Sequence, residues 1–281
     1  MKKYTEINLN DSEGKHHTTI RFPSGEECIR IKPTVKKRVI LTAKDKNGWS
    51  LILLGQAVQI LRSYGVEEII LYMPYFPNAR QDRVAVEGDP NAVKAYADMI
   101  NALGFDRVIV ADPHSDVLRA VVDNLRVIEQ RDIVARYWYA CDHSVSQFAL
   151  VSPDNGARKK CAALALEFGI PIVECDKTRD PETGALNGFR IISGEQHIAR
   201  PLWLIDDICD GGGTFLGLAR KLREKGAMNI TLFVTHGLFT KGLEDLHSQF
   251  NRIVTTDSLG RQEDVGTLDL KGLRDELIAS N

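Results

Sequence analysis

The sequence predicts an α/β fold in which mainly parallel sheets are flanked by helices. Short, continuously apolar runs recur along the chain, and amphipathic stretches with helical spacing lie between many of them. Most of the apolar runs end in polar or acidic residues. Continuous apolar runs are typical of parallel strands buried on both faces, and such sheets bind ligands beyond the carboxyl ends of their strands. We therefore expect the functional residues at those ends.

The apolar runs give the expected strands in chain order: residues 38–42, 68–72, 107–112, 148–152, 170–173, 202–205, 229–235 and 252–255. Apolar residues at helical spacing predict helices over 49–64, 92–103, 157–168 and 215–225. Residues 2–32 contain turn signals at Gly14 and at 23–25, which predict irregular or hairpin structure. Weak periodicity over 139–145 predicts a boundary between two domains, 1–142 and 143–281.

Composition narrows the class of protein. The chain has 281 residues, of which 43% are hydrophobic and 26% charged, with a net charge of -2, so we expect neither nucleic acid nor an acidic membrane as partner. Its five cysteines are scattered without a Cys-x-x-Cys pair, which argues against a disulfide framework or a structural zinc site. The first residues lack the apolar stretch of a signal peptide, and no apolar run approaches membrane-spanning length. A cytoplasmic location is expected.

The most informative segment follows the apolar run 202–205. It combines three acids with three glycines and a threonine: Asp206, Asp207, Asp210, Gly211, Gly212, Gly213 and Thr214. Glycines let backbone N–H groups approach a phosphate at the start of the following helix, and the carboxylates accept hydrogen bonds from sugar hydroxyls. The loop is therefore a candidate site for a sugar phosphate. The alternative is that the acids cap the helix and the glycines only make the turn.

Other polar residues also follow expected strands. Arg80 and Gln81 offer groups suited to phosphate oxygens or a base edge, although a solvated surface turn explains them equally. His114 is a candidate metal or phosphate contact, or else a structural histidine. Asp154 is a candidate metal ligand, or a turn residue after Pro153. Lys177 lies at the start of a polar stretch, 176–187. We expect this stretch to be a mobile loop that closes over a polyphosphate; the alternative is an ordinary exposed loop.

Taken together, these segments resemble ribose-phosphate pyrophosphokinases. Residues 75–83, Tyr-Phe-Pro-Asn-Ala-Arg-Gln-Asp-Arg, match a signature of that family except at Asn78, and 206–214 match its phosphoribosyl-binding signature with Gly211 in place of a threonine. Residues 22–26 resemble its Phe-x-Asp-Gly-Glu loop with Ser24 in place of the aspartate. Further similar motifs occur in the family's order at 112–115, 152–156 and 176–179, the last interrupted by Thr178.

The resemblance implies two phosphoribosyltransferase-type domains and an enzyme that transfers diphosphate from ATP to C1 of ribose 5-phosphate, for nucleotide and NAD biosynthesis. It implies Mg²⁺ as cofactor and a homo-oligomer built on dimers, a hexamer being one arrangement. Implied catalytic residues are Lys177 and Arg179, and implied metal ligands are His114 and Asp154. The implied ATP-binding residues are Phe22, Ser24, Glu26, Arg80, Gln81 and His114. Those implied for ribose 5-phosphate are Arg179, Asp206, Asp207, Asp210, Gly211, Gly212, Gly213 and Thr214.

Two alternatives stay open. A phosphoribosyltransferase of base salvage would explain residues 206–214 but not 22–26 or 80–83. A non-catalytic regulatory homologue would keep the fold, and Ser24 and Gly211 are compatible with it. The retained residues that favour an active enzyme are Lys177, Arg179, His114 and Asp154.

Overall fold

The structure, a computed structural model, describes residues 3–48, 50–140, 147–179 and 186–280. It divides into two compact units: unit 1 comprises residues 1–129 and 272–281, and unit 2 comprises 130–271. Contacts divide the chain at 129/130, and they place residues 272–281 with unit 1. The expected boundary over 139–145 lies largely outside the described residues, and the domain limits 1–142 and 143–281 stay a prediction.

Unit 1 is built on a parallel five-stranded sheet. Its strand order is β1 (Thr5–Asn8), β4 (Arg38–Thr42), β5 (Glu68–Tyr72), β6 (Arg107–Ala111) and β7 (Leu125–Ile128). The in-register pairing of β4 with β5 joins two fully apolar strand interiors. A separate hairpin of β2 (His17–Arg21) and β3 (Glu27–Ile31) accounts for the hairpin expected within residues 2–32.

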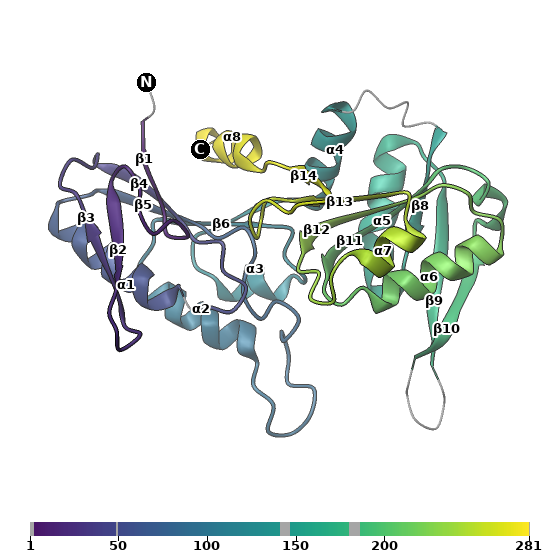
Figure 1. Cartoon of the computed structure of the whole chain (residues 1–281), viewed down its shortest axis with the longest axis horizontal. Coiled ribbons are helices and arrows are strands. Elements are labelled where there is room, and N and C mark those ends of the chain that lie inside the picture. Colours follow the sequence, from purple (N-terminus) through teal and green to yellow (C-terminus); the bar gives the residue numbers. More distant parts are fainter. Residues whose placement is uncertain (1–2, 49, 141–146, 180–185, 281) are drawn as a thin grey trace. The chain divides into compact units, whose positions relative to one another are not determined.

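The two faces of this sheet have different covers (Figure 1). Alternate strand residues such as Leu41 and Leu71 share one core with α1 (Leu51–Ser63), α2 (Ala92–Ala102), α3 (Val117–Val121) and the β2–β3 hairpin. On the other face lies α8 (Lys271–Ala279), where the Arg274 guanidinium stacks 5.2 Å from the centre of the Tyr72 ring. Helix α8 thus covers the sheet of the unit to which the N-terminal residues belong.

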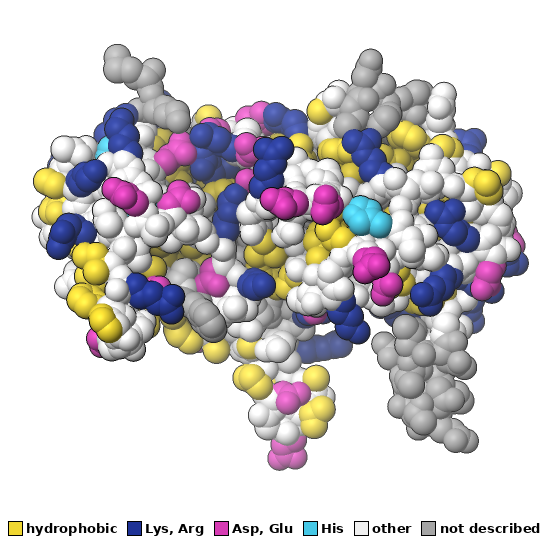
Figure 2. Space-filling model, viewed as in Figure 1, with side chains coloured by type: hydrophobic (Ala, Val, Ile, Leu, Met, Phe, Trp, Pro, Cys, Tyr) yellow, Lys and Arg dark blue, Asp and Glu magenta, His cyan; other side chains and the backbone are white. Residues whose placement is uncertain are grey.

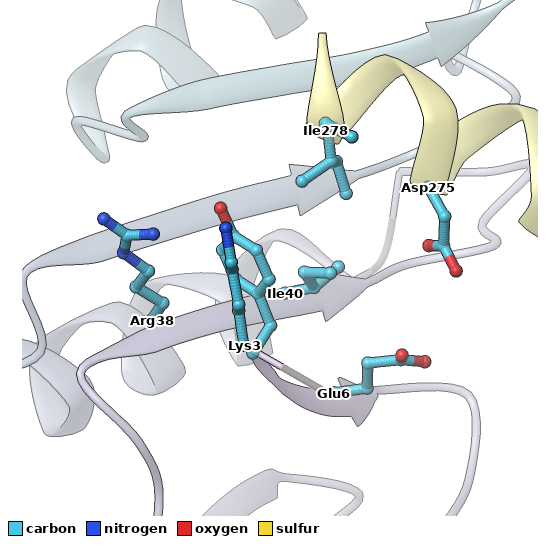
Figure 3. Close-up of a pocket in the computed structure, with 8 residues that line it drawn as sticks. Lys3, Glu6, Arg38, Ile40, Asp275 and Ile278 are labelled. Carbon is cyan, nitrogen blue, oxygen red and sulfur yellow. The ribbon is translucent and has the colours of Figure 1, made fainter. Parts of the chain in front are cut away.

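A cavity of about 330 Å³ lies under α8. Ile278 of α8 stands across it from Ile40 of β4, and Lys3, Glu6 and Arg38 also line it (Figure 3). Arg38 and Glu68, which form an ion pair at 3.4 Å, begin their strands, so this cavity lies at the amino ends of the sheet. It is therefore distinct from the carboxyl ends, where the sequence places the functional residues.

Unit 2 contains a seven-stranded sheet. Its strand order is β10 (Leu186–Ser193), β9 (Ile172–Arg179), β8 (Ala149–Ser152), β11 (Leu202–Cys209), β12 (Ile230–Gly237), β13 (Arg252–Thr256) and β14 (Gly266–Leu268). Every neighbouring pair is parallel except β10 with β9. The central strands β8, β11 and β12 are almost wholly buried, which explains their continuous apolar sequences.

Alternate residues of β11 show how the faces are covered. Leu202 and Leu204 share a core with α6 (Gly213–Glu224) and α7 (Glu244–Gln249). Trp203 points the other way, into an aromatic cluster that includes Trp138 of α4 (Gln130–Ala140), whose ring centre lies 5.6 Å away. Trp138 in turn contacts Phe168 at the end of α5 (Asn155–Phe168). Helices therefore cover both faces, and the predicted α/β class is confirmed.

Two sequence-based boundaries are wrong. Strand β11 does not stop before Asp206 but runs on to Cys209, because Ile208 and Cys209 still pair with β12. The stretch 176–187 was expected to be a loop, but β9 extends to Arg179 and pairs with β10. The middle of that stretch, 180–185, lies outside the described residues. Both boundaries were misplaced because polar strand ends look like loops in a sequence.

Acidic and basic side chains are interspersed on the surface, and Figure 2 shows no large patch of one sign on the face it presents. This distribution matches the net charge of -2. In the part of the chain that the structure describes, no helix is both long and apolar enough to span a membrane.

Candidate active site

Three neighbouring strands bring Lys177, Asp154 and Asp206 together in unit 2. Lys177 lies near the end of β9, Asp154 follows β8, and Asp206 lies in the last half of β11. Because β9, β8 and β11 are adjacent and parallel, their carboxyl ends meet at one edge of the sheet. The prediction that polar residues at the strand ends lie together at one edge of the sheet is confirmed for these three residues.

The Asp154 carboxylate links helix α5 to strand β9. One of its carboxylate oxygens caps helix α5 by accepting a hydrogen bond from the Ala157 N–H at 3.1 Å, and the other accepts from the Lys177 ammonium at 2.7 Å. Partial burial favours the neutral acid, but the Lys177 hydrogen bond and the backbone N–H donors outweigh it and lower the pKa of Asp154. The cap and the ion pair therefore hold a charged carboxylate at the strand edge.

Asp206 has the opposite environment. Burial and repulsion from Asp207, with a further contribution from Asp154, raise the pKa of the Asp206 carboxyl well above its ordinary value. Its Oδ1 accepts a hydrogen bond from the Asp207 N–H at 3.0 Å, and Asp207 is itself only 7% exposed. Negative charge is thus crowded at this edge, which favours a ligand that donates hydrogen bonds or brings a cation.

The raised pKa of Asp206 predicts a pH-dependent stability. A carboxyl with a raised pKa binds more protons in the folded than in the unfolded protein, so its contribution to stability falls as pH rises above the unfolded value of about 4. We expect Asp206→Asn, which cannot ionise, to raise the melting temperature more at about pH 8 than at about pH 4. Thermal melts of both proteins at the two pH values measure this. An equal gain at both would contradict the environment described for Asp206.

The glycine-rich connection between β11 and α6 is shaped by one special backbone conformation. Gly212, the residue before α6, has φ 75°, a left-handed conformation that favours glycine. A Cβ there would also lie 3.1 Å from Leu246. Gly213, by contrast, faces open space and begins α6, whose first N–H groups carry positive potential. This geometry leaves room for a phosphate at the start of the helix.

The structure places every predicted ribose 5-phosphate residue of this segment on one connection. Asp206 and Asp207 lie in β11, Gly213 and Thr214 begin α6, and the other three lie between them: Asp210, Gly211 and Gly212. Asp210 accepts a hydrogen bond from the Thr240 hydroxyl at 2.6 Å. Thr240 was not found by sequence reasoning, since no spacing links it to a residue thirty positions away.

In unit 1, two neighbouring strand ends hold the other candidates. The segment after β5 is anchored by buried Phe76, whose ring packs edge-on against Tyr96 at 5.2 Å, and Arg80 and Gln81 follow on the exposed surface. A backbone hydrogen bond of 2.9 Å from Ala111 to Pro74 joins this segment to the end of β6. The two strand ends therefore form one polar edge.

Asp112 and His114 come from the end of β6. Asp112 is 1% exposed and has φ 36°, an uncommon conformation for a residue other than glycine that is often found at functional sites. His114, two residues later, is exposed. The buried aspartate thus fixes the turn from which the histidine projects.

The predicted nucleotide loop, residues 22–26, forms the exposed tip of the β2–β3 hairpin. The Gly25 N–H donates to the Phe22 carbonyl at 2.9 Å, and Gly25 has φ 90°. The Ser24 hydroxyl donates to Glu26 at 2.9 Å, and Phe22 is 47% exposed. An exposed aromatic ring at the tip of an ordered turn is suited to contact with a ligand or another subunit.

Comparison with known proteins gives the family. Residues 6–104 match the model of the N-terminal domain of ribose phosphate pyrophosphokinase. The chain is 32% identical over 249 residues to the ribose-phosphate pyrophosphokinase of Maricaulis maris, covering 85% of this chain and 78% of that one. The chain belongs to the ribose-phosphate pyrophosphokinase family. The ribose-phosphate pyrophosphokinase of Mesorhizobium japonicum is 31% identical to this chain over 280 residues, which cover 95% of this chain and 86% of that enzyme.

The fold agrees with this family. The crystal structure of phosphoribosylpyrophosphate synthetase from Mycobacterium smegmatis superposes with a TM-score of 0.80 at 22% identity, over 94% of this chain and 89% of that chain. The predicted pair of phosphoribosyltransferase-type α/β domains is therefore confirmed as a fold class.

Two residues that were predicted to lie in a loop, Lys177 and Arg179, lie in a strand of the structure. Lys177 lies in strand β9 opposite Phe189 of β10, not in a loop. Arg179 ends the same strand, but its side chain lies outside the part of the chain that the structure describes. The roles of both residues stay predictions.

The described ranges contain no group of three or more His, Cys, Asp and Glu side chains arranged to hold a metal ion. Mg²⁺ does not require one, because it keeps several waters and binds through one or two carboxylates together with substrate phosphates. The carboxylates of Asp154, Asp206 and Asp207 are oxygen donors of the kind Mg²⁺ prefers. Burial, and after it repulsion from the neighbouring carboxylates, raises the pKa of Asp206, and a cation would relieve the repulsion. The donor set at this edge therefore fits Mg²⁺.

The buried thiols of unit 2 are poor nucleophiles. Burial raises the pKa of Cys161, Cys175 and Cys209 to about 12 in each case, so the thiolate is scarce at neutral pH. The site's chemistry therefore suits binding and charge stabilisation rather than covalent catalysis by these cysteines.

Proposed function

We propose that the protein is a ribose-phosphate pyrophosphokinase that converts ATP and ribose 5-phosphate to phosphoribosyl pyrophosphate and AMP. The C1 hydroxyl oxygen of the sugar attacks the β-phosphorus of ATP, the bond from that phosphorus to the bridging oxygen of AMP breaks, and the hydroxyl proton is released. The observation that carries the proposal is the strand edge of unit 2, where Asp206, Asp207 and the glycine-rich start of α6 adjoin the Lys177–Asp154 ion pair.

Each substrate has its own set of residues. Asp206 and Asp207 accept hydrogen bonds from the ribose hydroxyls, and the N–H groups at the start of α6 bind the 5-phosphate. Arg80, Gln81, His114 and the loop 22–26 bind ATP. Arg80 and Gln81 are exposed on the segment after β5, and His114 is exposed after β6, which supports this assignment.

The substrate supplies the nucleophile, so the enzyme's task is alignment and charge neutralisation. Lys177 and Arg179 meet the negative charge that develops on the transferred diphosphoryl group. His114 and Asp154 are proposed as Mg²⁺ ligands at two different metal positions, where the ion would supply neutralisation of phosphate charge. The Lys177 ammonium donates a hydrogen bond of 2.7 Å to Asp154, which holds the ammonium at the strand edge.

The products of one reaction test this function against its alternatives. Purified protein with Mg-ATP and ribose 5-phosphate, followed by phosphorus NMR, should produce AMP together with phosphoribosyl pyrophosphate. A phosphoribosyltransferase would instead consume phosphoribosyl pyrophosphate and a base. ADP as the nucleotide product, or no turnover, would overturn the proposal, and the second result would favour a regulatory homologue.

The proposed assembly is a homo-oligomer built on dimers, acting in the cytoplasm. The exposed hairpin tip at 22–26 supports the first part, since the resemblance implies that this loop reaches the nucleotide of a neighbouring subunit. Unpaired Cys28, Cys161, Cys175 and Cys209 are compatible with a reducing compartment.

Ser24 predicts relaxed selection of the base. The Ser24 hydroxyl donates its hydrogen to Glu26. The hydroxyl oxygen is uncharged, so it accepts a hydrogen bond from an adenine amino group less strongly than the aspartate of the family signature would. We expect measurable activity with GTP, and a shift toward ATP of about tenfold in Ser24→Asp, from the strength of a hydrogen bond to a charged group. The ratio of kcat/KM for the two nucleotides measures this, with Ser24→Ala as the control that gains no charge. Strict rejection of GTP by the unaltered protein would contradict it.

A further inference from the structure

The segment after β12 runs along the glycine-rich connection. The N–H groups of Leu238 and Phe239 both donate to the Cys209 carbonyl, at 2.8 and 3.1 Å, and the Thr240 N–H donates to the Asp210 carbonyl at 3.1 Å. The Thr240 hydroxyl adds its hydrogen bond of 2.6 Å to the Asp210 carboxylate. These bonds fix the position of the next residue, Lys241, beside the loop.

The side chain of Lys241 lies directly over Gly211. A Cβ placed on Gly211 would lie 3.2 Å from Cδ and 3.3 Å from Cε of Lys241, closer than side chains normally pack. The lysine stem therefore occupies the space that a side chain at residue 211 would need. The stem brings the ammonium, one bond beyond Cε, close to the loop.

This ammonium is not engaged elsewhere. Lys241 is exposed and forms no ion pair or hydrogen bond with any residue that the structure describes. The connection itself carries the carboxylates of Asp206, Asp207 and Asp210, which repel a phosphate dianion. A cation at the loop offsets that repulsion, and the partial charge at the start of α6 is only about half a unit.

We infer that Lys241 binds the phosphate of the sugar-phosphate substrate and takes the place of the threonine hydroxyl that is absent at Gly211. The inference rests on the proposed function, since it deepens the assignment of this loop. A side chain at residue 211 would crowd the lysine stem in its present position, so the two positions are coupled. A charged donor in place of a neutral hydroxyl strengthens the contact with phosphate.

Calorimetric titration with ribose 5-phosphate tests this. Lys241→Met keeps an unbranched stem over Gly211 and removes the charge, and we expect its dissociation constant to be about tenfold higher than that of the unaltered protein. Lys159→Met, at an exposed lysine of α5 in the same unit, is the control and should bind normally. Unphosphorylated ribose should bind both variants and the unaltered protein alike.

The outcomes separate the two proposals. Equal binding of ribose 5-phosphate by the unaltered protein and Lys241→Met overturns the role of Lys241 and leaves the proposed function standing. A failure of the unaltered protein to bind ribose 5-phosphate overturns both.

A double-mutant cycle tests the coupling between the two positions. Gly211 is not among the glycines with positive φ, so its backbone accepts a threonine. We expect Gly211→Thr alone to weaken binding, because its side chain meets Lys241, and Gly211→Thr with Lys241→Ala to bind more tightly than Lys241→Ala alone. Additive effects would overturn the coupling.

Discussion

Lys177→Ala should lower turnover at saturating substrates by about 10²–10³-fold, the usual loss when one preorganised donor to transition-state charge is removed. Lys177 lies in an ordered strand and already points its ammonium at the substrate edge, held there by Asp154 at 2.7 Å. An ordered donor costs no reorganisation during the reaction, so its removal should reduce kcat rather than binding alone. Steady-state kinetics measure the change, and circular dichroism checks that the variant folds.

A matched control and a lower assay temperature separate this catalytic role from a purely structural one. Lys159→Ala, the matched change at an exposed lysine of α5, should keep normal turnover. If Lys177 acted only by neutralising Asp154 in the fold, the loss in Lys177→Ala would come from unfolding, and assays well below the melting temperature of the variant would recover turnover. We expect no recovery. Near-normal turnover of Lys177→Ala would show that the lysine has no part in the reaction.

Asp206→Ala should raise the Michaelis constant for ribose 5-phosphate by tenfold or more. The change removes an acceptor for ribose hydroxyls, and a hydrogen bond to a charged group contributes about 1.5–3 kcal/mol. The constant for ATP should change much less, because the ATP-binding residues are assigned to unit 1. Initial rates with each substrate varied in turn measure both constants.

The control for this prediction is Asp245→Ala, an exposed acid on α7 of the same unit. It should leave both constants unchanged. If Asp206→Ala altered the two constants equally, the assignment of separate residues to the two substrates would be wrong.

Much of the fold could be predicted from the sequence because its parallel strands are buried on both faces. Such strands have continuously apolar sequences, as in β4, β5 and β6, and their bounds follow directly from the pattern. Apart from the expected hairpin, strands without this burial were not predicted. β1 has alternating burial, and β10 is an antiparallel edge strand with a bulged register. Their sequences resemble loops because little of each strand is buried.

The candidate site was predicted as a set of residues but not as an arrangement. Asp206, Asp207 and the glycines stand next to one another in the chain, so their proximity needed no fold. The Lys177–Asp154 pair depends on β8 and β9 being neighbours, which the sequence does not specify. Lys241 was missed for the same reason, since only the pairing of β11 with β12 places it over Gly211.

The return of α8 to unit 1 affects the order in which the protein can fold as it is synthesised. Unit 1 is discontinuous, because its main part ends at Glu129 and its last helix is made only after the whole of unit 2. Until then the sheet face that contains Ile40 lacks its cover. Domains made first usually fold first. Here the N-terminal unit receives the cover of one sheet face only after unit 2 has been made, and the nascent chain exposes that face until α8 has been synthesised.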